Sequence, residues 1–333
     1  MYRKDLSEEA FRKVAKYFLR DKKDIKSLSL NRVPDHHSFT RILQVQFVNR
    51  REERFVVKIL KDGKWNTDKS VADILHEIAI QKELNQLGFT TRNYLFVESS
   101  SNNPIGIPFS VSTCLEGTPL STMSVREIAA LIPKVLDILY NLHSKTISIS
   151  FGYSLKPKER YTGKGSILFG DFESKYLLAD IKRYNIRFDE QEKKDLMQAI
   201  NFLNETDQFS LCHCDATLSN IIWDGSNICL IDWTYSHFTE PTYDIAYLIF
   251  WLLELKLLNE AQKEIERAFK RYQKLGLEIA PRFLFYLAQK YIEFGRFKGV
   301  SYIKQGKQLL KEIPSKSLED LLSSITKISQ KTL

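Results

Sequence analysis

The feature that most constrains the fold is a change in hydrophobic period along the chain. Between residues 25 and 60, apolar and polar residues alternate in the runs "IKSLSL", "RILQVQFV" and "RFVVKIL". A period of two is typical of half-buried strands. After Gly117, the run "SVREIAALIPKVLDILYNLHS" is apolar at helical spacing instead. The sequence therefore predicts an α+β fold, with a small β-rich lobe over 1–115 and a larger, mainly helical lobe over 116–333.

Further elements are predicted from the same periodicity. We expect a helix at the start of the chain, a second helix closed by Gly88, and a strand pair around the turn "SSSNNPIG". Residues 145–170 lack a clear period and predict a loop. The predicted helices cover 5–19, 70–87, 172–184, 190–203 and most of 243–333.

Composition excludes several classes of protein. The chain has 333 residues, 43% hydrophobic and 27% charged, so it is long enough for two lobes and too apolar for a disordered chain. Its longest apolar run, Ile245 to Leu253, has nine residues, whereas a membrane span needs about 20. No signal peptide is evident, and four cysteines do not make a disulfide framework. We therefore expect a cytoplasmic protein without a membrane span.

The net charge of +8 raises the question of nucleic-acid binding. Lys and Arg are scattered among 41 acidic residues rather than gathered in one block, which is typical of a solvated surface. We expect no nucleic-acid partner, although a basic binding protein is the alternative. The sequence leaves the oligomeric state open.

Polar ligand types are concentrated in "LCHCDATLSNIIWDGSNICLIDW", residues 211–233. One interpretation is a metal site formed by Cys212, His213 and Cys214. Consecutive residues of an extended chain point to opposite sides, and the chain has no CxxC or HxxxH partner. We therefore favour buried, unpaired cysteines over a structural zinc site.

The acidic residues of this stretch fit phosphoryl transfer better. Asp215 lies two residues after His213, Asn220 follows five residues later, and Asp232 ends the strand "NICLID". This spacing provides a carboxylate to accept the proton of an attacking hydroxyl, at Asp215, and oxygen ligands for Mg²⁺, at Asn220 and Asp232. His213 is expected to hold the loop by a hydrogen bond within it.

"LCHCDATLSNIIW" followed by "LIDWTYSHFTEPTYDIAY" resembles the phosphotransferase family that includes aminoglycoside kinases, macrolide kinases and choline kinases, a relative of the protein-kinase fold. The resemblance implies a two-lobe kinase with ATP and Mg²⁺ as cofactors. It also implies that Asp244 braces the loop, while its sequence alone indicates an N-terminal helix cap. His143 in "LYNLHS" matches a Leu-His of the family, and we expect it to pack rather than to catalyse.

In the small lobe, Lys58 lies inside the apolar strand "RFVVKIL". A lysine there is costly unless its charge is paired. The resemblance implies two partners, the nucleotide phosphates and a helix glutamate. We choose Glu77 for that glutamate, with Glu83 as the alternative; the other possibility is a surface lysine at a strand edge.

The resemblance also places nucleotide contacts at two loops. "FSVSTCLEGTPL" resembles the hinge of the family, so backbone groups of Ser112 to Leu115, including Cys114, are expected to face the adenine edge. The phosphate loop is expected at "PDHHSFTRILQV", where the amide of Ser38 would point at phosphate. His36 and His37 stand there in place of small residues, so their effect on nucleotide binding is open, as is ATP versus GTP.

The spacing after Asp232 bears on the acceptor. Protein kinases have a Lys two residues after the catalytic Asp, whereas this chain has Thr217, and only eleven residues separate Asp232 from Asp244. A platform for a polypeptide does not fit, so we expect a small hydroxylated acceptor. The competing class is a non-catalytic nucleotide-binding regulator, which usually lacks the base or a metal ligand.

The acceptor itself is predicted from charge and aromatic content. Residues 245–333 hold 16 Lys and Arg against 9 Asp and Glu, which disfavours a polycationic aminoglycoside. Rings in this region can bind a quaternary ammonium group, although core packing is the simpler explanation. We place a choline-like amino alcohol slightly ahead of an aminoglycoside or macrolide antibiotic. The rings are Phe283, Phe285, Tyr286, Tyr291, Phe294, Phe297 and Tyr302.

Overall fold

The computed structural model describes residues 8–32, 40–59, 67–100, 102–103, 105–145, 178, 181–182, 185–203, 210–274 and 279–313. The chain forms two compact units. The first unit contains the described residues of Met1–Gly117 together with Cys229–Thr234. The second unit contains those of Thr118–Ser148, Lys156–Ile228 and Tyr235–Leu333. A short segment after residue 228 therefore belongs with the N-terminal part of the chain.

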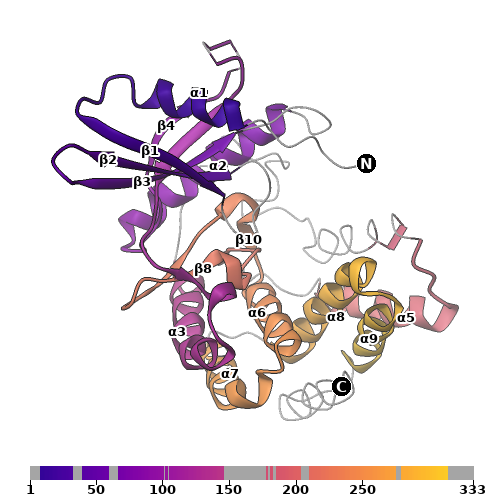
Figure 1. Ribbon diagram of the computed structural model, residues 1–333. Coiled ribbons are helices and arrows are strands. Elements are labelled where there is room, and N and C mark those ends of the chain that lie inside the picture. Colours follow the sequence, from indigo (N-terminus) through magenta and orange to yellow (C-terminus); the bar gives the residue numbers. More distant parts are fainter. Residues whose placement is uncertain are drawn as a thin grey trace. The chain divides into compact units, whose positions relative to one another are not determined.

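The first unit is built on a five-stranded antiparallel sheet (Figure 1). Its strands lie in the order β1 (Ile25–Arg32), β2 (Thr40–Phe47), β3 (Glu52–Ile59), β5 (Phe109–Thr113) and β4 (Tyr94–Glu98). In the central strand β3, Lys58 lies opposite Thr40 on β2 and Ser110 on β5. A central position fixes the backbone of Lys58 on both sides, so the direction of its side chain is set by the sheet.

One face of this sheet is covered by α1 (Glu8–Phe18). Phe11 and Val14 of α1 are fully buried against Leu43 on β2 and Val57 on β3. These strand residues are the apolar members of the alternating pattern. Because alternate side chains of a strand point to the same face, they form one buried face of the sheet. The helix α2 (Thr67–Gln86) follows β3 and ends before Gly88, whose φ of 84° allows the chain to turn.

The second unit is mainly helical (Figure 1). Its first helix, α3 (Val125–His143), begins at Ser124, whose hydroxyl accepts from the Glu127 amide while the Glu127 carboxylate accepts from the Ser124 amide. This capping box satisfies two amides that the first helical turn leaves unpaired. The other helices are α5 (Glu190–Leu203), α6 (Thr242–Glu254), α7 (Leu258–Gln273), α8 (Ile279–Lys298) and α9 (Val300–Glu312).

Helices α8 and α9 pack closely because two glycines lie at their contact. A Cβ atom on Gly306 would be 2.8 Å from the carbonyl oxygen of Ala288, and one on Gly295 would be 2.4 Å from Ile303 Cγ1. Neither position has room for a side chain, so these glycines set the distance between the two helices. Helix α8 is thereby held in place and can present its other face to α6.

Short elements connect the helices of the second unit. Strand β7 (Ser210–Cys212) pairs with β10 (His237–Thr239), and β6 (Thr118–Pro119) pairs with β8 (Ile221–Trp223). The 3-10 turns η1 (Leu120–Thr122) and η3 (Leu218–Asn220) also belong to the second unit. Most of strand β9 (Ile228–Leu230) and of turn η4 (Trp233–Tyr235) lies in the segment that belongs to the first unit. The loop that starts at His213 is held between β7 and η3.

Most predicted elements are present with shifted ends. The first helix begins at Glu8 rather than residue 5, and the second helix begins at Thr67 rather than residue 70. The predicted helix at 190–203 is α5. The loop predicted at 145–170 and most of the helix predicted at 172–184 lie outside the described residues. Among the described helices, none is both long and apolar enough to cross a membrane.

Candidate active site

In the first unit, Lys58 lies between two carboxylates. Its Nζ atom is 3.6 Å from Asp232 Oδ1 and 3.8 Å from Glu77 Oε2. The Lys58 side chain is 30% exposed, whereas the side chain of Glu77 is 2% exposed. The structure therefore brings together the predicted strand lysine, the predicted helix glutamate and the predicted metal ligand. Glu77, and not Glu83, is the partner on α2.

The environment of Lys58 keeps its charge in place. Burial by itself would lower the pKa of Lys58, but the carboxylates of Asp232 and Glu77 outweigh burial and raise this pKa. Lys58 is therefore protonated over the physiological pH range. A permanent cation at the end of an apolar strand is suited to binding an anion such as a phosphate.

Two more groups hold Glu77, and no local pattern in the sequence marks them. Gln81 Nε2, one turn along α2, donates to Glu77 Oε1 at 2.9 Å. The hydroxyl of Thr234 lies 2.7 Å from Asp232 Oδ1 and 3.3 Å from Glu77 Oε2. Thr234 thus bridges the two carboxylates that flank Lys58. We call Lys58, Glu77, Asp232 and Thr234 the lysine cluster.

Tyr94, on β4, also borders the lysine cluster. Burial raises the pKa of Tyr94 well above its usual value, and the negative charge of Glu77 raises it further. The phenol therefore stays protonated and donates a hydrogen bond to Glu77. Sequence reasoning missed this contact because Tyr94 and Glu77 lie on different elements, and nothing local marks the pair.

In the second unit, the loop His213–Asn220 holds the candidate base, Asp215. His213 Nδ1 accepts from the Asp215 amide at 3.3 Å, so the predicted hydrogen bond of His213 within its own loop is present. Cys214 has a φ of 62°, a left-handed conformation that is uncommon for a residue with a side chain. This turn at Cys214 takes the chain away from the direction of β7 immediately before Asp215.

Asn220 holds Asp215 from the other end of the loop. Its Nδ2 atom donates to the Asp215 carboxylate at 2.8 Å and to the Asp215 carbonyl at 2.9 Å. Asn220 is 2% exposed, and its Oδ1 atom is buried without a hydrogen-bond partner in the described part of the chain. An unpartnered buried oxygen is costly, so this atom is suited to a ligand that the polypeptide does not supply.

Each of the two predicted Mg²⁺ ligands offers an oxygen of the type that Mg²⁺ prefers. In the second unit this is the buried Oδ1 of Asn220, and in the first unit it is the partly exposed carboxylate of Asp232. Asp232 has a φ of 63°, a conformation that an Asp tolerates better than a branched residue. Strain of this kind is common where a side chain must be aimed at a ligand.

The carboxylate of Asp244 fixes the start of the 213–220 loop. Its Oδ2 accepts from the amide of His213 at 2.7 Å, and its Oδ1 accepts from the amide of Cys214 at 2.8 Å. Asp244 lies in the first turn of α6, whose N-cap is Pro241. The interpretation of Asp244 as a helix cap is therefore wrong, because both oxygens bind amides of another segment.

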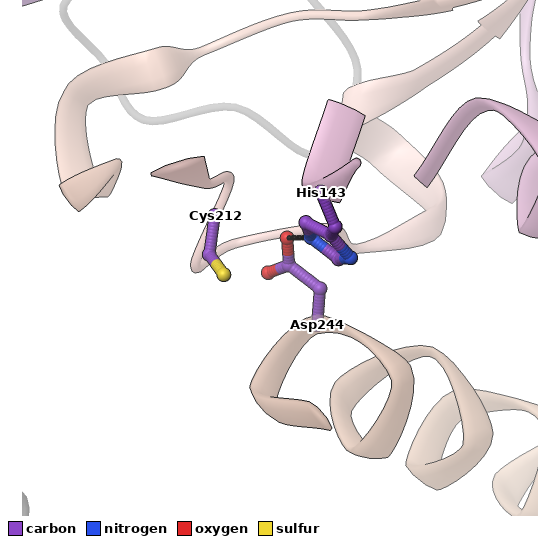
Figure 2. Close-up of side chains that lie close together, drawn as sticks. All are labelled: His143, Cys212 and Asp244. Carbon is purple, nitrogen blue, oxygen red and sulfur yellow. Dashed lines mark hydrogen bonds and ion pairs between the residues drawn. The ribbon is translucent and has the colours of Figure 1, made fainter. Parts of the chain in front are cut away.

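His143 and Tyr272 extend this brace into the core. Figure 2 shows the first step, the contact of His143 with Asp244. His143 Nε2 is 3.0 Å from Asp244 Oδ2, and His143 Nδ1 is 2.7 Å from the Tyr272 hydroxyl. A carboxylate only accepts, so Nε2–H donates to Asp244 and Nδ1 accepts from Tyr272. Burial raises the pKa of Tyr272 well above its usual value and keeps it a donor. His143 is a buried positioning residue, as predicted.

The same region contains a set of metal-ligand types. His143, Cys212 and Asp244 have ligand atoms within 4.8 Å of one another (Figure 2). Each of these atoms already has a hydrogen-bond role. The Cys212 thiol lies 3.4 Å from the carbonyl of Glu240 and donates to it, whereas a metal would require the thiolate. We therefore interpret the trio as a structural network.

The predicted hinge residues lie at the end of β5. Ser112 is paired with Val56 on one side and Tyr94 on the other, and the Cys114 amide donates to the Arg54 carbonyl at 3.2 Å. None of the four cysteines, Cys114 included, forms a disulfide bond. Contacts of Ser112 and Cys114 with a nucleotide stay a prediction. Ser38, His36 and His37 of the predicted phosphate loop lie outside the described residues.

A β-sheet unit with a lysine cluster and a helical unit with a braced Asp-Asn loop define the class of kinase-like phosphotransferases. The chain belongs to the phosphotransferase enzyme family, whose sequence profile matches residues 40–277. This match confirms the family that the sequence motifs resemble. A search of curated proteins finds no matching sequence.

Solved structures confirm the predicted fold class. The aminoglycoside phosphotransferase APH(4)-Ia is 15% identical, with a TM-score of 0.57 over 91% of this chain and 98% of that chain. An ethanolamine kinase of Plasmodium vivax is 15% identical, with a TM-score of 0.59 over 97% of this chain and 89% of that chain. The GDP complex of aminoglycoside 2'-phosphotransferase-IIIa is 13% identical, with a TM-score of 0.54 over 92% and 98%. The chain thus has the kinase-like fold of these enzymes over nearly its whole length.

Proposed function

We propose that this phosphotransferase transfers the γ-phosphoryl group of ATP to a hydroxyl of a small molecule. Asp215 accepts the proton of that hydroxyl, and Lys58 binds the nucleotide phosphates with Glu77 as its partner. Asn220 and Asp232 hold Mg²⁺, which neutralises charge on the phosphates when it is bound. His213 and Asp244 position the loop that carries Asp215.

The observation that carries this proposal is the double role of Asn220. One side-chain atom fixes the Asp215 carboxylate, while the other is a buried oxygen without a hydrogen-bond partner among the described residues. A buried oxygen without a partner is costly, and a bound cation would satisfy it. A site in which one residue both orients the base and offers a ligand oxygen is suited to phosphoryl transfer with a metal ion.

The competing proposal is a non-catalytic nucleotide-binding regulator on the same fold. Such a protein is expected to lack the base, the lysine or a metal ligand, whereas Asp215, Lys58, Asn220 and Asp232 are all present. We therefore favour the enzyme.

Two measurements on the purified chain test the choice. An enzyme is expected to be stabilised against heat by ATP only when Mg²⁺ is present, and to release ADP slowly even without an acceptor. Stabilisation by ATP without any ADP release would favour the regulator. GTP is tested in parallel, because one neighbour was solved with AMP-PNP and another with GDP.

The acceptor is proposed only as a class. Neighbours of this fold include an ethanolamine kinase and a phosphotransferase solved with hygromycin B, so an amino alcohol and an aminoglycoside antibiotic are both candidates. A macrolide is a third. One of the grounds for preferring choline is the set of rings in the C-terminal region. Four of these rings are core residues with at most 1% exposure: Phe283, Phe285, Tyr286 and Tyr291. Burial removes that support, and the choice of acceptor stays a prediction.

The segment after Asp232 is consistent with a small acceptor. Residues 233–235 form the turn η4, residues 237–239 form β10, and α6 begins at Thr242. These elements take up most of the residues between Asp232 and Asp244, and no extended platform for a polypeptide is present among them. We further propose a cytoplasmic enzyme that does not bind nucleic acid, because its four cysteines form no disulfide bond and its basic residues are dispersed.

A further inference from the structure

A buried lysine occupies an aromatic site next to the 213–220 loop. Lys290, on α8, has a side chain that is 4% exposed. Its Nζ atom lies 3.9 Å from the ring centre of Tyr247 and 4.6 Å from that of Tyr243, both on α6. It also donates to the Tyr243 hydroxyl at 2.8 Å and to Glu293 Oε2 at 3.2 Å. The two tyrosines therefore bind an ammonium group that the protein itself supplies.

This arrangement lies beside the candidate base. Tyr243 precedes Asp244, whose carboxylate holds the amides of His213 and Cys214. Tyr247 follows one turn later on α6, so the two rings lie on the same face of that helix. The negative charge of Asp215 acts on Tyr247, which places the base near this face. Burial by itself would lower the pKa of Lys290, but the negative charges of Glu293 and Asp215 help to raise it. Lys290 is therefore a cation close to the reacting hydroxyl of the proposed reaction.

The cation has consequences for the choice of acceptor. A quaternary ammonium group is recognised by aromatic faces that surround it. The Tyr243 and Tyr247 faces are already in contact with Lys290, so a second cation would have to displace a buried ammonium and its ion pair with Glu293. Like charges at this distance also repel. An oxygen of the acceptor, in contrast, can receive a hydrogen bond from Lys290 or from a tyrosine hydroxyl.

We infer that Lys290 is a specificity-determining residue of the proposed phosphotransfer reaction: it excludes alkylammonium groups from the Tyr243–Tyr247 site and selects an acceptor that presents oxygen atoms there, as a sugar or a hydroxy acid does. The inference rests on the proposed function for the reaction itself. It separates this chain from enzymes whose acceptor is choline or ethanolamine.

Binding of choline without nucleotide tests the exclusion directly. Isothermal calorimetry compares the wild type, Lys290→Ala and Lys298→Ala. The last variant is a matched control, because Lys298 lies on the same helix and is 50% exposed. Lys290→Ala frees both ring faces and the Glu293 carboxylate, so we expect it to bind choline saturably, with a Kd at least about tenfold below the lower limit that the wild type sets. The control should match the wild type.

Several outcomes would overturn the inference. Saturable choline binding by the wild type would do so, as would a folded Lys290→Ala protein that binds choline no better than the wild type. Circular dichroism and a cooperative thermal transition establish that the variant is folded. Should it not fold, Lys290→Met keeps the length of the side chain but removes its charge. Because the repulsion is lost and the Glu293 carboxylate is released, this variant is expected to bind choline more tightly than the wild type, and no gain would overturn the inference.

The wild type alone provides the second test. Release of ADP is measured with D-ribose and D-glycerate as oxygen-rich acceptors and with choline and ethanolamine as amino alcohols. Acceleration by ribose or glycerate, with none by choline or ethanolamine, is expected; saturable acceleration by either amino alcohol would overturn the inference. The calorimetry involves no turnover, so its result does not depend on whether the proposed phosphotransfer takes place. The exclusion of choline by Lys290 and the proposed phosphotransfer can therefore be contradicted independently.

Discussion

The side-chain amide of Asn220 donates to the carboxylate of Asp215 at 2.8 Å and to the Asp215 carbonyl at 2.9 Å. The two residues are separated by one tight loop whose other end is fixed by Asp244. A carboxylate held at both its side chain and its backbone loses little entropy when it meets a substrate. The geometry therefore supports a pre-oriented base, and the consequences of this arrangement can be measured.

Asp215→Asn is expected to lower turnover by about 10²–10⁴-fold, the usual contribution of a general base. The amide oxygen of the new Asn can still accept from Asn220, so folding and ATP binding should be nearly unchanged. ADP release and thermal melting with ATP are the measurements. Asp21→Asn, at a side chain that is 88% exposed, is the matched control. Turnover above about one third of the wild-type rate would remove Asp215 from this role.

Asn220→Ala and Asp232→Ala are expected to raise the Mg²⁺ concentration needed for half-maximal ADP release. Each variant removes one proposed oxygen ligand, and two ligands of one cation act as a unit. Asn220→Ala should also slow turnover at saturating Mg²⁺, because it releases the Asp215 carboxylate. A magnesium titration that is unchanged in both variants would show that the metal is held elsewhere.

Lys58→Ala should mainly impair use of the nucleotide, and Glu77→Ala should give a milder form of the same defect. Glu77 acts by holding Lys58, and its carboxylate keeps contacts with Gln81 and Thr234 when Lys58 is absent. A double-mutant cycle on kcat/KM for ATP measures the coupling. Strictly additive effects would contradict the pair.

Thr234→Val is expected to raise the half-saturating Mg²⁺ concentration by about tenfold, the typical effect of losing a group that orients a metal ligand. The hydroxyl lies 2.7 Å from Asp232 Oδ1, and valine keeps the shape while removing the donor. Thr234→Ser retains the hydroxyl and serves as the control. If Thr234→Val and Thr234→Ser have the same half-saturating Mg²⁺ concentration, the hydroxyl of Thr234 has no part in orienting Asp232.

Asp244→Asn is expected to destabilise the fold at neutral pH by about 2–5 kcal/mol, because an amide cannot accept from all three donors. Burial alone would raise the pKa of Asp244, but the hydrogen bond from His143 and the His213 amide hold it below its usual value. The lower folded-state pKa stabilises the protein above the unfolded value of about 3.9, and this contribution is lost as the pH falls through the folded value.

Urea denaturation of the wild type and Asp244→Asn across this pH range is the measurement. The difference in free energy of unfolding between the two proteins should be constant near neutral pH and should narrow below about pH 4. A difference that stays constant through acid would mean that the ionised carboxylate of Asp244 does not stabilise the fold.

The sequence by itself determined the order of the two parts and the composition of the 213–220 loop. A period of two or of 3.6 depends only on neighbours along the chain, so the strands that carry Lys58 and the helix that ends at His143 were both predicted. Spacing within one loop is also local, which is why Asp215 and Asn220 were found together. The contact of Glu77 with Lys58 was predicted only because a family resemblance supplied the partner type.

Tertiary structure decided the contacts between distant segments. Tyr272 reaches His143 across 129 residues, Thr234 reaches Glu77 across 157, and Lys290 reaches Tyr243 across 47. No local pattern marks such pairs, because they depend on which helix faces meet and how closely they pack. The same reason explains the aromatic rings of the C-terminal region, because the sequence shows that they are numerous but not that most of them are buried in the core. It also does not show that Lys290 lies against Tyr243 and Tyr247.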